Sequence, residues 1–483
     1  MGRSPCRIFN YPCKKVLTIP MPWFNSSTYG SVRKGSLEKK KLYIQTFGCQ
    51  MNVQDAEKMA ALLVPSGYGS TDDPGQADLI LINTCSIREK AEQKIHSQLG
   101  RFRALKQNNP HLLIGVGGCL AQQWGNRLFR RAPFVDLVFG THQIHRLPKM
   151  VGELERAKGR IVETGFCDRV RSLEIPAQPA AGAVGTFVTI MQGCNNFCAY
   201  CVVPHLRGRE ESRPLPEILR EVEMLAGCGI REVTLLGQNV NSYGLTLPEE
   251  TDFAELIGAI GRVPGIERIR FTTSHPKDLS PRLIACFGEI APLCEHIHLP
   301  VQSGSDRVLA RMNRGYAAAA YREKVAALRK ASPGISITSD VIVGFPGEEE
   351  ADFEQTLELM REIRFDNLFS FQYSEREGTA AVGMDRPVSE GIKRERLRTL
   401  QSLQAEHTLE KNRSCVGRRE ELLVEGLSRN DCGEMTGRTR GNRIVNFPGE
   451  AGLVGKMVSV RIVGAFLHSL RGEMEQRGGE DVH

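Results

Sequence analysis

Three cysteines lie close together near the middle of the 483-residue chain, at positions 194, 198 and 201. Their spacing, C-x3-C-x2-C, places three thiols on one tight loop. Three thiolates can hold three irons of a 4Fe–4S cube, which leaves the fourth iron without a protein ligand. Such an open iron can bind a small molecule, so the spacing predicts a cluster that carries out chemistry as well as carrying electrons.

The same segment also allows a zinc site. Cys198, Cys201 and His205 are spaced C-x2-C-x3-H, and Cys194 would complete a set of four ligands. A disulfide is less favoured, because nothing in the sequence marks the chain as secreted. The spacing favours the iron–sulfur cluster, with zinc as the alternative.

A second part of the sequence alternates apolar runs with helix-like segments. The apolar runs are residues 41–47, 78–83 and 112–116, and the helix-like segments are residues 55–63 and 89–107. Strands that alternate with helices argue for a parallel α/β sheet. We therefore expect an N-terminal α/β domain.

Each of these three apolar runs is followed by a cysteine: Cys49, Cys85 and Cys119. In open α/β sheets, ligands bind at the carboxyl ends of the strands. Glycines beside two of these cysteines would let the backbone approach a bulky ligand closely. The pattern predicts a second cluster with three protein thiolates and one open iron. The alternative is three buried cysteines that simply follow core strands.

Composition places few limits on function. The chain is 41% hydrophobic and 25% charged, which is ordinary for a soluble globular protein of two to four domains. No apolar run approaches the roughly 20 residues that would cross a bilayer. The net charge of +7 is compatible with a polyanionic partner without being evidence for one. Eight further cysteines show no ligand spacing: Cys6, Cys13, Cys167, Cys228, Cys286, Cys294, Cys415 and Cys432.

The first 38 residues differ in composition from the rest. They are basic, carry no acid before Glu38 and sustain no apolar period, so we expect a disordered extension. A transit peptide and a misassigned start codon are the alternatives. Residues 161–183 include a stretch rich in Pro, Ala and Gly, which predicts a linker.

Six βα-like units occupy the centre of the chain, and the cysteine loop at 194–201 follows the first of their strands. Six parallel repeats suggest a barrel that is incomplete and open on one side. In βα barrels, function lies on the loops that follow the strands, as this loop does. The expected strands are residues 187–191, 232–236, 268–273, 297–301, 336–343 and 368–373.

The last part of the chain carries short β-like runs at 421–424, 443–445 and 456–462, separated by Gly, Asn and Asp. This pattern predicts a small antiparallel barrel. Basic faces on such barrels commonly bind RNA, and the alternative is a solvated charged face. The candidate RNA-binding residues are Arg418, Arg438, Arg440 and Arg443.

The cysteine loop resembles that of the radical S-adenosylmethionine (SAM) enzymes, and residues 40–470 resemble the radical-SAM methylthiotransferases. Within that family, the sequence is most similar to the tRNA 2-methylthioadenosine synthases. Residues 375–380 depart from the Gly-Thr-Pro string that the family often has. The motifs that carry the resemblance are NTCSIREKA at 83–91, GVGGCLAQQ at 115–123, DLVFGTH at 136–142, YCVVP at 200–204 and LGQNVNS at 236–242.

The resemblance implies a three-domain α/β architecture: a parallel α/β domain, an incomplete (β/α)6 radical-SAM barrel, and an antiparallel TRAM barrel that is OB-like. We expect no membrane segment, a cytoplasmic location and a monomer. The expected boundaries are 1–38 for the extension, 39–160 for the N-terminal methylthiotransferase domain, 161–183 for the linker, 184–410 for the radical-SAM domain, 411–475 for TRAM and 476–483 for a tail.

The resemblance also implies an activity, the addition of a methylthio group to C2 of N6-isopentenyladenosine at position 37 of tRNA. Cys194, Cys198 and Cys201 would hold the cluster that cleaves SAM. The auxiliary cluster, held by Cys49, Cys85 and Cys119, would carry the sulfur, and two SAM molecules would be used per turnover. No acid–base residue is expected, because the C2–H bond is neither acidic nor electrophilic.

Several strings that follow barrel strands would line the SAM site in this interpretation. Partners would be the tRNA anticodon stem-loop, an electron donor such as flavodoxin or ferredoxin, and iron–sulfur or sulfur carriers. The candidate SAM-binding residues are Gln238, Asn239, Gln302, Ser303, Gly304 and Gly344.

Two other functions fit parts of the pattern. One is a methylthiotransferase that acts on threonylcarbamoyladenosine of tRNA or on ribosomal protein S12. The other is a zinc or iron–sulfur protein that binds RNA without catalysis.

Overall fold

The computed structural model describes residues 40–85, 89–176, 179, 182–428 and 433–474. The expected extension at 1–38 and the tail at 476–483 lie outside the described residues. The chain divides into two units, residues 1–181 and 182–483. In the parts of the chain that are described, no helix is long and apolar enough to span a membrane.

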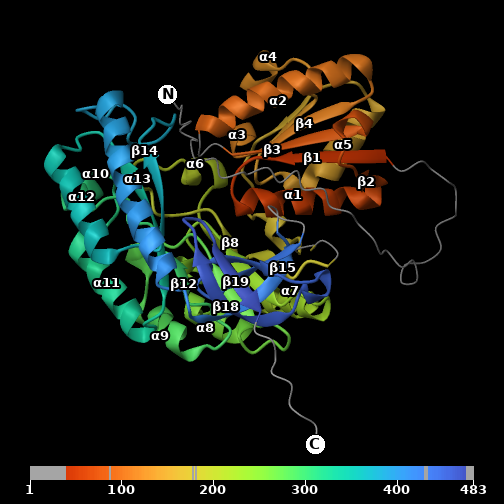
Figure 1. Cartoon of the computed structure of the whole chain (residues 1–483). Helices are drawn as coiled ribbons and strands as arrows, with labels where there is room; N and C mark the ends of the chain where they lie inside the picture. Colours follow the sequence, from red (N-terminus) through yellow and green to blue (C-terminus); the bar gives the residue numbers. More distant parts are fainter. Residues whose placement is uncertain (1–39, 86–88, 177–178, 180–181, 429–432, 475–483) are drawn as a thin grey trace, which may run out of the picture. The chain divides into compact units, whose positions relative to one another are not determined.

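The first unit is built on a six-stranded parallel sheet in the order β2-β1-β3-β4-β5-β6 (Figure 1). The three expected strands are confirmed as β1, β3 and β4, whereas β2, β5 and β6 are three-residue strands that the sequence pattern does not reveal. The strands are β1 (Lys40–Thr46), β2 (Tyr68–Ser70), β3 (Leu79–Thr84), β4 (Leu113–Gly118), β5 (Leu137–Phe139) and β6 (Ile161–Glu163).

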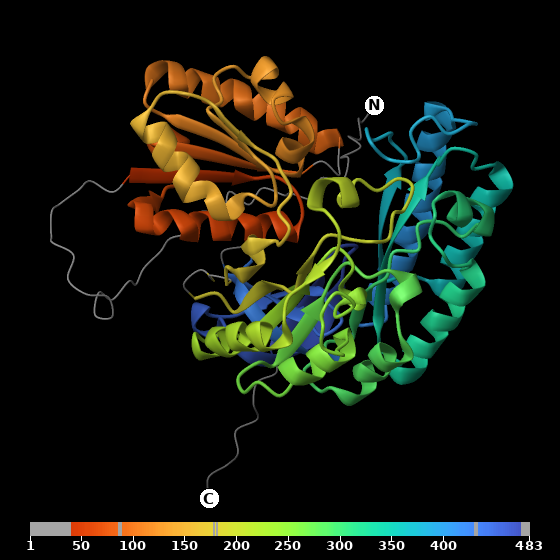
Figure 2. The ribbon, with the colours of Figure 1, turned by 180° about the vertical axis from the view of Figure 1, so that it is seen from behind.

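Helices cover both faces of this sheet, and β3 is buried throughout. Ile80 and Ile82 lie in the core cluster that includes Phe102 of the helix α2. Leu79 and Leu81 of β3 pack on the other face with residues of α1 and α5. Figure 2 shows helices of this unit on both faces of the sheet. Burial on both faces explains why the strand reads as one continuous apolar run. The helices are α1 (Gln50–Leu63), α2 (Glu89–Asn108), α3 (Cys119–Trp124), α4 (Arg127–Arg131) and α5 (Leu147–Arg156).

The second unit begins with six parallel strands, and all six expected strands are confirmed. They form two three-stranded ladders, β7-β10-β11 and β12-β13-β14, which a bridge between Ile269 and Leu293 connects. The first and last strands, β7 and β14, lie at opposite ends of this order, so the barrel is incomplete. The strands are β7 (Gly185–Thr189), β10 (Glu232–Leu236), β11 (Arg268–Phe271), β12 (His296–His298), β13 (Ser336–Val343) and β14 (Asn367–Gln372).

Helices follow the barrel strands, and a two-stranded hairpin, β8 (Met191–Gln192) with β9 (Glu211–Ser212), brackets the cysteine loop. Apolar side chains of the helices at 3.6-residue spacing pack toward the strands. The helices are α6 (Val203–Arg207), α7 (Leu215–Gly227), α8 (Phe253–Ile260), α9 (Pro281–Glu289), α10 (Asp306–Arg311), α11 (Ala318–Ala331), α12 (Glu350–Ile363) and α13 (Glu390–Arg413).

The chain ends in a closed five-stranded barrel in the order β15-β16-β17-β19-β18, as expected for a small antiparallel barrel. Its core includes Leu422, Phe447 and Val460, which are fully buried. The sequence pattern missed β16 and β19, because both are short and largely polar. The strands are β15 (Arg419–Leu427), β16 (Glu434–Thr439), β17 (Ile444–Pro448), β18 (Met457–Ala465) and β19 (Leu470–Met474).

Candidate functional site

The loop that carries Cys194, Cys198 and Cys201 leaves the carboxyl end of β7 and is closed at its neck by the β8–β9 hairpin. Gly193 stands in the left-handed region at φ +81°, and a Cβ there would overlap the carbonyl oxygen of Arg209. Only glycine fits this position without strain. The backbone N–H of Cys194 donates to the carbonyl of Gly208 at 3.3 Å, which returns the chain across the neck of the loop.

The three thiols of the loop lie near one another. Burial raises the pKa of Cys194 to about 11 and that of Cys201 to about 12, and the neighbouring Cys198 adds to both shifts. The Cys194 and Cys201 thiols therefore keep their protons at neutral pH until a metal ion displaces them.

No three His, Cys, Asp or Glu side chains within the described ranges converge as a single-ion site requires. A 4Fe–4S cube binds each thiolate to a different iron, so its thiolates are spread farther apart than those of a zinc site. The donor set, three thiols on one glycine-hinged loop, fits such a cube.

A polar network lies beside the cysteine loop and includes two of the predicted SAM-binding residues. The side-chain oxygen of Gln238 accepts the N–H of Gly193 at 2.5 Å. The Asn239 amide donates to the carboxylate of Asp278 at 2.8 Å, and the Asn196 amide donates to the same oxygen at 3.0 Å. The residues that follow β10 and β11 are thus tied directly to the loop.

Buried polar atoms without partners mark where a ligand would bind in this network. They are Oε1 of Glu210, Oδ1 of Asn239 and Oγ of Ser274, none of which has a hydrogen-bond partner among the described residues. Burial raises the pKa of Glu210 to about 7, although Ser242 donates to its other oxygen at 2.7 Å. An unpaired buried polar atom is costly, so these atoms call for a polar ligand. The ammonium and hydroxyl groups of SAM provide such partners.

Cys49, Cys85 and Cys119 meet at one edge of the first sheet. Cys85 and Cys119 each follow a residue of the register pair Thr84↔Gly118. Gly48 lies against Cys85, since a Cβ at Gly48 would stand 2.7 Å from the Cys85 Cβ. The three cysteines therefore follow adjacent strands, at the point where the strand order reverses and ligands commonly bind.

Two buried asparagines support this edge. The Asn52 amide donates to Oδ1 of Asn83 and to the carbonyl of Thr84, both at 3.1 Å, and the Asn83 amide donates to the carbonyl of Asn52 at 2.7 Å. The Cys49 thiol donates to Oδ1 of Asn52 at 3.4 Å. Cys49 also occupies the N-cap position of α1.

Three family models match the chain. Residues 41–140 match the uncharacterized protein family UPF0004, residues 188–360 match the radical SAM superfamily, and residues 413–474 match the TRAM domain. The three matches overlap the parallel sheet, the incomplete barrel and the closed barrel described above, although the first ends before β6 and the second before β14.

Two relatives that match over most of their length share one name. The chain is 59% identical over 438 residues to the tRNA-2-methylthio-N(6)-dimethylallyladenosine synthase of Syntrophus aciditrophicus, covering 91% of this chain and 95% of the relative. It is 54% identical to the enzyme of that name from Geobacter sulfurreducens, covering 92% of this chain and 99% of the relative. The chain belongs to this family of radical-SAM methylthiotransferases.

More distant solved structures share the fold. The radical SAM methyltransferase TsrM from Kitasatospora setae aligns with a TM-score of 0.52 at 13% identity, covering 79% of each chain. The cobalamin-dependent radical enzyme OxsB aligns with a TM-score of 0.50 at 14% identity, covering 76% of this chain and 56% of that one. Membership of the radical-SAM family implies a 4Fe–4S cluster and SAM.

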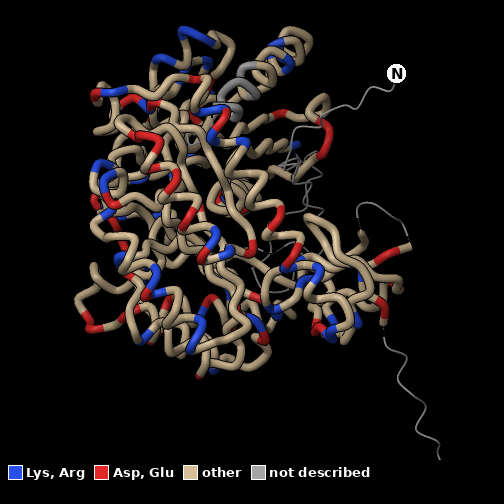
Figure 3. The backbone as a smooth tube through the Cα atoms, turned by 60° about the vertical axis from the view of Figure 1, so that its left-hand side comes forward, with Lys and Arg blue, Asp and Glu red and all other residues tan. Residues whose placement is uncertain are grey.

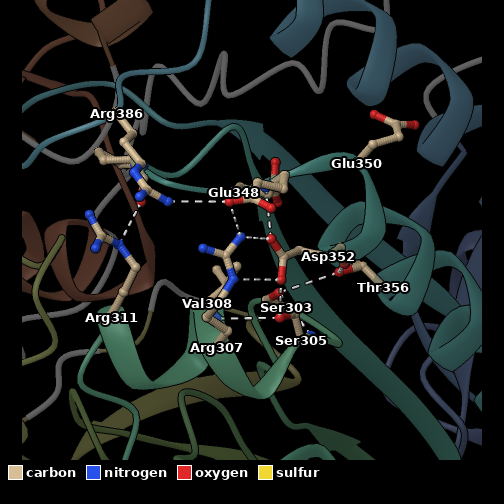
Figure 4. A network of polar contacts seen from close by, with 12 residues as sticks. Ser303, Ser305, Arg307, Val308, Arg311, Glu348, Glu350, Asp352, Thr356 and Arg386 are labelled. Carbon is tan, nitrogen blue, oxygen red and sulfur yellow. Dashed lines mark hydrogen bonds and ion pairs between the residues drawn. The ribbon is translucent and has the colours of Figure 1, made fainter.

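The other predicted SAM residues of this methylthiotransferase have structural contacts of their own. Ser303 lies 3.3 Å from Oγ1 of Thr356, and the Gly304 N–H donates to the same oxygen at 2.9 Å. Figure 4 shows Ser303, Ser305 and Thr356 beside Asp352, in the first turn of α12. Ser303 and Gly304 thus fasten the loop after β12 to that helix.

Gln302 and Gly344 both occupy the left-handed region, at φ +73° and +72°. Gln302 pairs its backbone with β13, and a Cβ at Gly344 would overlap the side chain of Lys393. The pairing with β13 and the packing against Lys393 therefore account for the left-handed backbone of Gln302 and Gly344 without a ligand. A role in SAM binding stays a prediction for both of them and for Ser303 and Gly304.

The four TRAM arginines predicted to bind RNA differ in their ion pairs. Arg440 makes a two-point ion pair with Glu295 at 2.7 and 2.8 Å, and Arg443 pairs with Asp366 at 2.5 Å. Both partners belong to the radical-SAM barrel, so each of these two arginines already has a carboxylate partner within the second unit. A role in RNA binding stays a prediction for both. The sequence shows how many basic residues TRAM has, but it does not show which of them form ion pairs within the folded protein.

The remaining two arginines differ from each other. Arg438 pairs with Glu425 at 2.8 Å, whereas Arg418 is exposed and makes no ion pair with the described residues. Figure 3 shows Lys and Arg interspersed with Asp and Glu along the chain. Of the four candidates, Arg418 is best placed to meet a phosphate.

Sequence reasoning missed two residues next to the cluster loop. Glu210 gives no signal, since it reads as one charge in a polar loop. Arg314 lies more than a hundred residues away along the chain, yet its guanidinium is 3.4 Å from the Cys198 sulfur. Only the folded barrel brings such residues to the site.

Proposed function

We propose that this chain adds a methylthio group to C2 of N6-dimethylallyladenosine at position 37 of tRNA. The observation that carries the proposal is the 59% identity, over 91% of the chain, to a relative named for that product. Two features support the proposal: the cysteine loop after β7 and the second cysteine set after β1, β3 and β4. Each set offers the three thiols that a 4Fe–4S cluster with one open iron requires.

The residues of the chain would divide the work between two sites. Cys194, Cys198 and Cys201 would bind three irons of the radical-SAM cluster, and the unpaired oxygens near them would orient SAM. When bound, an open-iron cluster with SAM supplies radical chemistry, which reaches a C–H bond that is neither acidic nor electrophilic. Burial of the site restricts water, which protects a reactive species from side reactions.

The second cysteine set would hold an auxiliary cluster that carries sulfur. Its support is geometric: three thiols follow three adjacent strands, and buried asparagines fix the surrounding backbone. Two cubes contain about eight irons, with an equal amount of sulfide. Iron and sulfide near that amount, with no zinc, are the expected analysis of anaerobically prepared protein. About one zinc per chain with no iron would instead support the RNA-binding alternative.

The implied substrate is a loop of structured RNA. A base next to the anticodon lies in a single-stranded loop, where it can leave the stack and enter an active site. We expect the exposed Arg418 to contact a backbone phosphate of the stem. A one-electron donor such as flavodoxin or ferredoxin and a sulfur carrier would complete turnover in the cytoplasm, with the enzyme acting as a monomer.

Mass spectrometry of tRNA nucleosides tests the proposal in cells with and without this gene. We expect the 2-methylthio nucleoside to disappear and its unthiolated precursor to accumulate. Complementation with Cys198→Ala should fail, whereas Cys228→Ala, which changes an exposed cysteine outside both sets, should restore the product. An unchanged 2-methylthio-dimethylallyl nucleoside would overturn the assignment and direct attention to threonylcarbamoyladenosine and protein S12.

A further inference from the structure

The cluster loop rests on the turn that follows α10. The Asn313 amide donates to the carbonyl of Phe197 at 2.9 Å, and the N–H of Ala199 donates to the carbonyl of Met312 at 2.9 Å. Asn313 occupies the left-handed region at φ +56°, which turns the chain toward the loop. Consecutive residues of the turn therefore hold the backbone on either side of Cys198.

The third residue of this turn, Arg314, reaches the cysteine itself. Its Nη1 lies 3.4 Å from the Cys198 sulfur and 3.2 Å from the Tyr200 hydroxyl. Its Nη2 donates to the carbonyl of Pro300 at 2.7 Å, and its Nε donates to the Tyr316 hydroxyl at 3.1 Å. The guanidinium is fixed on three sides, so it has one position relative to the sulfur.

The charge of Arg314 is buried, since only 4% of the residue is exposed. Its partners are a carbonyl, two phenol groups and a thiol, and it pairs with no carboxylate in the described parts of the chain. A buried cation without an opposite charge is strongly unfavourable. A cube held by three thiolates carries a net negative charge, so the cluster supplies the counter-charge that the protein lacks.

The Cys198 sulfur faces a second polar hydrogen as well. Nδ1 of His275 accepts the N–H of Lys277 at 3.1 Å, so in neutral His275 the proton is on Nε2. That Nε2 lies 3.8 Å from the Cys198 sulfur. The Cys194 sulfur, by contrast, accepts the backbone N–H of Asn196 at 3.4 Å. Cys198 is therefore the cysteine of the loop whose sulfur lies next to polar side chains of the barrel, those of Arg314 and His275.

We propose that Arg314 is a positioning residue of the radical-SAM cluster, which fixes the Cys198 thiolate and raises the reduction potential of the cluster. This inference rests on the proposed function. Reduction moves one electron from an external one-electron donor to the cluster, and the donor is oxidised by one electron. No proton moves, and Arg314 stays charged throughout. A fixed positive charge at the sulfur favours the more negative, reduced cluster.

The test is a redox titration of the full chain in which only this cluster is present. A background with Cys49→Ala, Cys85→Ala and Cys119→Ala removes the second set of thiols. Dithionite is the reductant, and electron paramagnetic resonance reports the reduced cluster. Arg314→Gln removes the charge, Arg314→Lys keeps it without the planar fork, and Arg311→Gln is the control. Arg311 is the last residue of α10, three residues before Arg314, and it pairs with Asp385 rather than with a cysteine.

We expect Arg314→Gln to lower the ratio of reduced to oxidised cluster about tenfold at the parent midpoint, a shift of about 59 mV to more negative potential. Arg314→Lys should shift in the same direction by less, and Arg311→Gln should match the parent. If Arg314→Gln does not fold, a more negative midpoint of Arg314→Lys decides in favour of the proposal.

An unchanged or more positive midpoint in either Arg314 variant would overturn the inference. Its failure is distinguishable from failure of the proposed function. A background protein that binds no iron contradicts the cluster itself, whereas an iron-loaded protein with an unshifted midpoint contradicts only the role of Arg314.

Discussion

Glu210 shows how a single residue near the cluster loop responds to burial. Burial raises the pKa of its carboxyl group to about 7, above the 4.5 of an exposed glutamate. The folded chain therefore holds this proton more tightly than the unfolded chain does. By linkage, Glu210 lowers the free energy of unfolding progressively as the pH rises from about 4.5 to about 7, and its full destabilising contribution is present above that window.

Glu210→Gln should remove this pH dependence. We expect the variant to have a higher melting temperature than the parent at about pH 8 and to lose that advantage at about pH 5, where the parent carboxyl is protonated. Calorimetry of both proteins in the same cluster-loaded state checks this. Glu223→Gln, at an exposed position on α7, is the matched control and should follow the parent at both pH values. Equal differences at the two pH values would show that Glu210 is not the titrating group.

At the scale of elements, the length of the apolar pattern in the sequence decides which strands it reveals. Strand β3 was predictable as a continuous apolar run and β13 as an eight-residue strand with alternating buried residues. In contrast, β2, β5 and β6 have three residues each and leave no pattern. Strand β12 is equally short, but the apolar residues that follow it lengthen its run in the sequence. A ligand role for the six cysteines stays a prediction, but the residues themselves were recognisable in the sequence because each follows a strand or stands in a fixed spacing. Their supports were not, since Asn52 and Arg314 act through contacts that only the tertiary fold creates.

The junction of β1, β3 and α1 depends on the amide of Asn52. Asn52→Ala leaves the Thr84 carbonyl and the Asn83 amide oxygen without their donor, which costs about 2 kcal/mol in a fully buried site. We expect the unfolding free energy to fall by that amount. We also expect iron to fall from about eight toward about four per chain, because the edge that carries the second cysteine set loosens.

Chemical unfolding and metal analysis measure these two effects. Gln107→Ala, at the exposed end of α2, is the control and should change the unfolding free energy by less than about 0.5 kcal/mol. Full iron content in a destabilised Asn52→Ala protein would mean that the asparagine pair serves the fold alone.

At the scale of the whole molecule, the TRAM barrel is built into the second unit rather than tethered to it. Two arginines at the start of β11 donate to its backbone: Arg268 to the carbonyls of Arg438 and Glu421, and Arg270 to those of Thr439 and Arg440. In the other direction, Arg440 of the TRAM barrel forms an ion pair with Glu295 of the radical-SAM barrel. Arginines of both β barrels thus join TRAM to the radical-SAM barrel, and the sequence does not reveal these contacts because the partners lie far apart along the chain.

This arrangement predicts that the joint is a source of stability. Arg268 is fully buried, so Arg268→Ala leaves two TRAM carbonyls without their charged donor and should lower the unfolding free energy of the second unit by about 3 kcal/mol. Arg262→Ala, on the exposed surface before the same strand, should change it by less than about 0.5 kcal/mol. Chemical unfolding followed by hydrogen exchange locates the effect. Loss of protection in both β11 and β16 would confirm that the domains unfold together, whereas loss confined to β16 would mean that TRAM opens as an independent module.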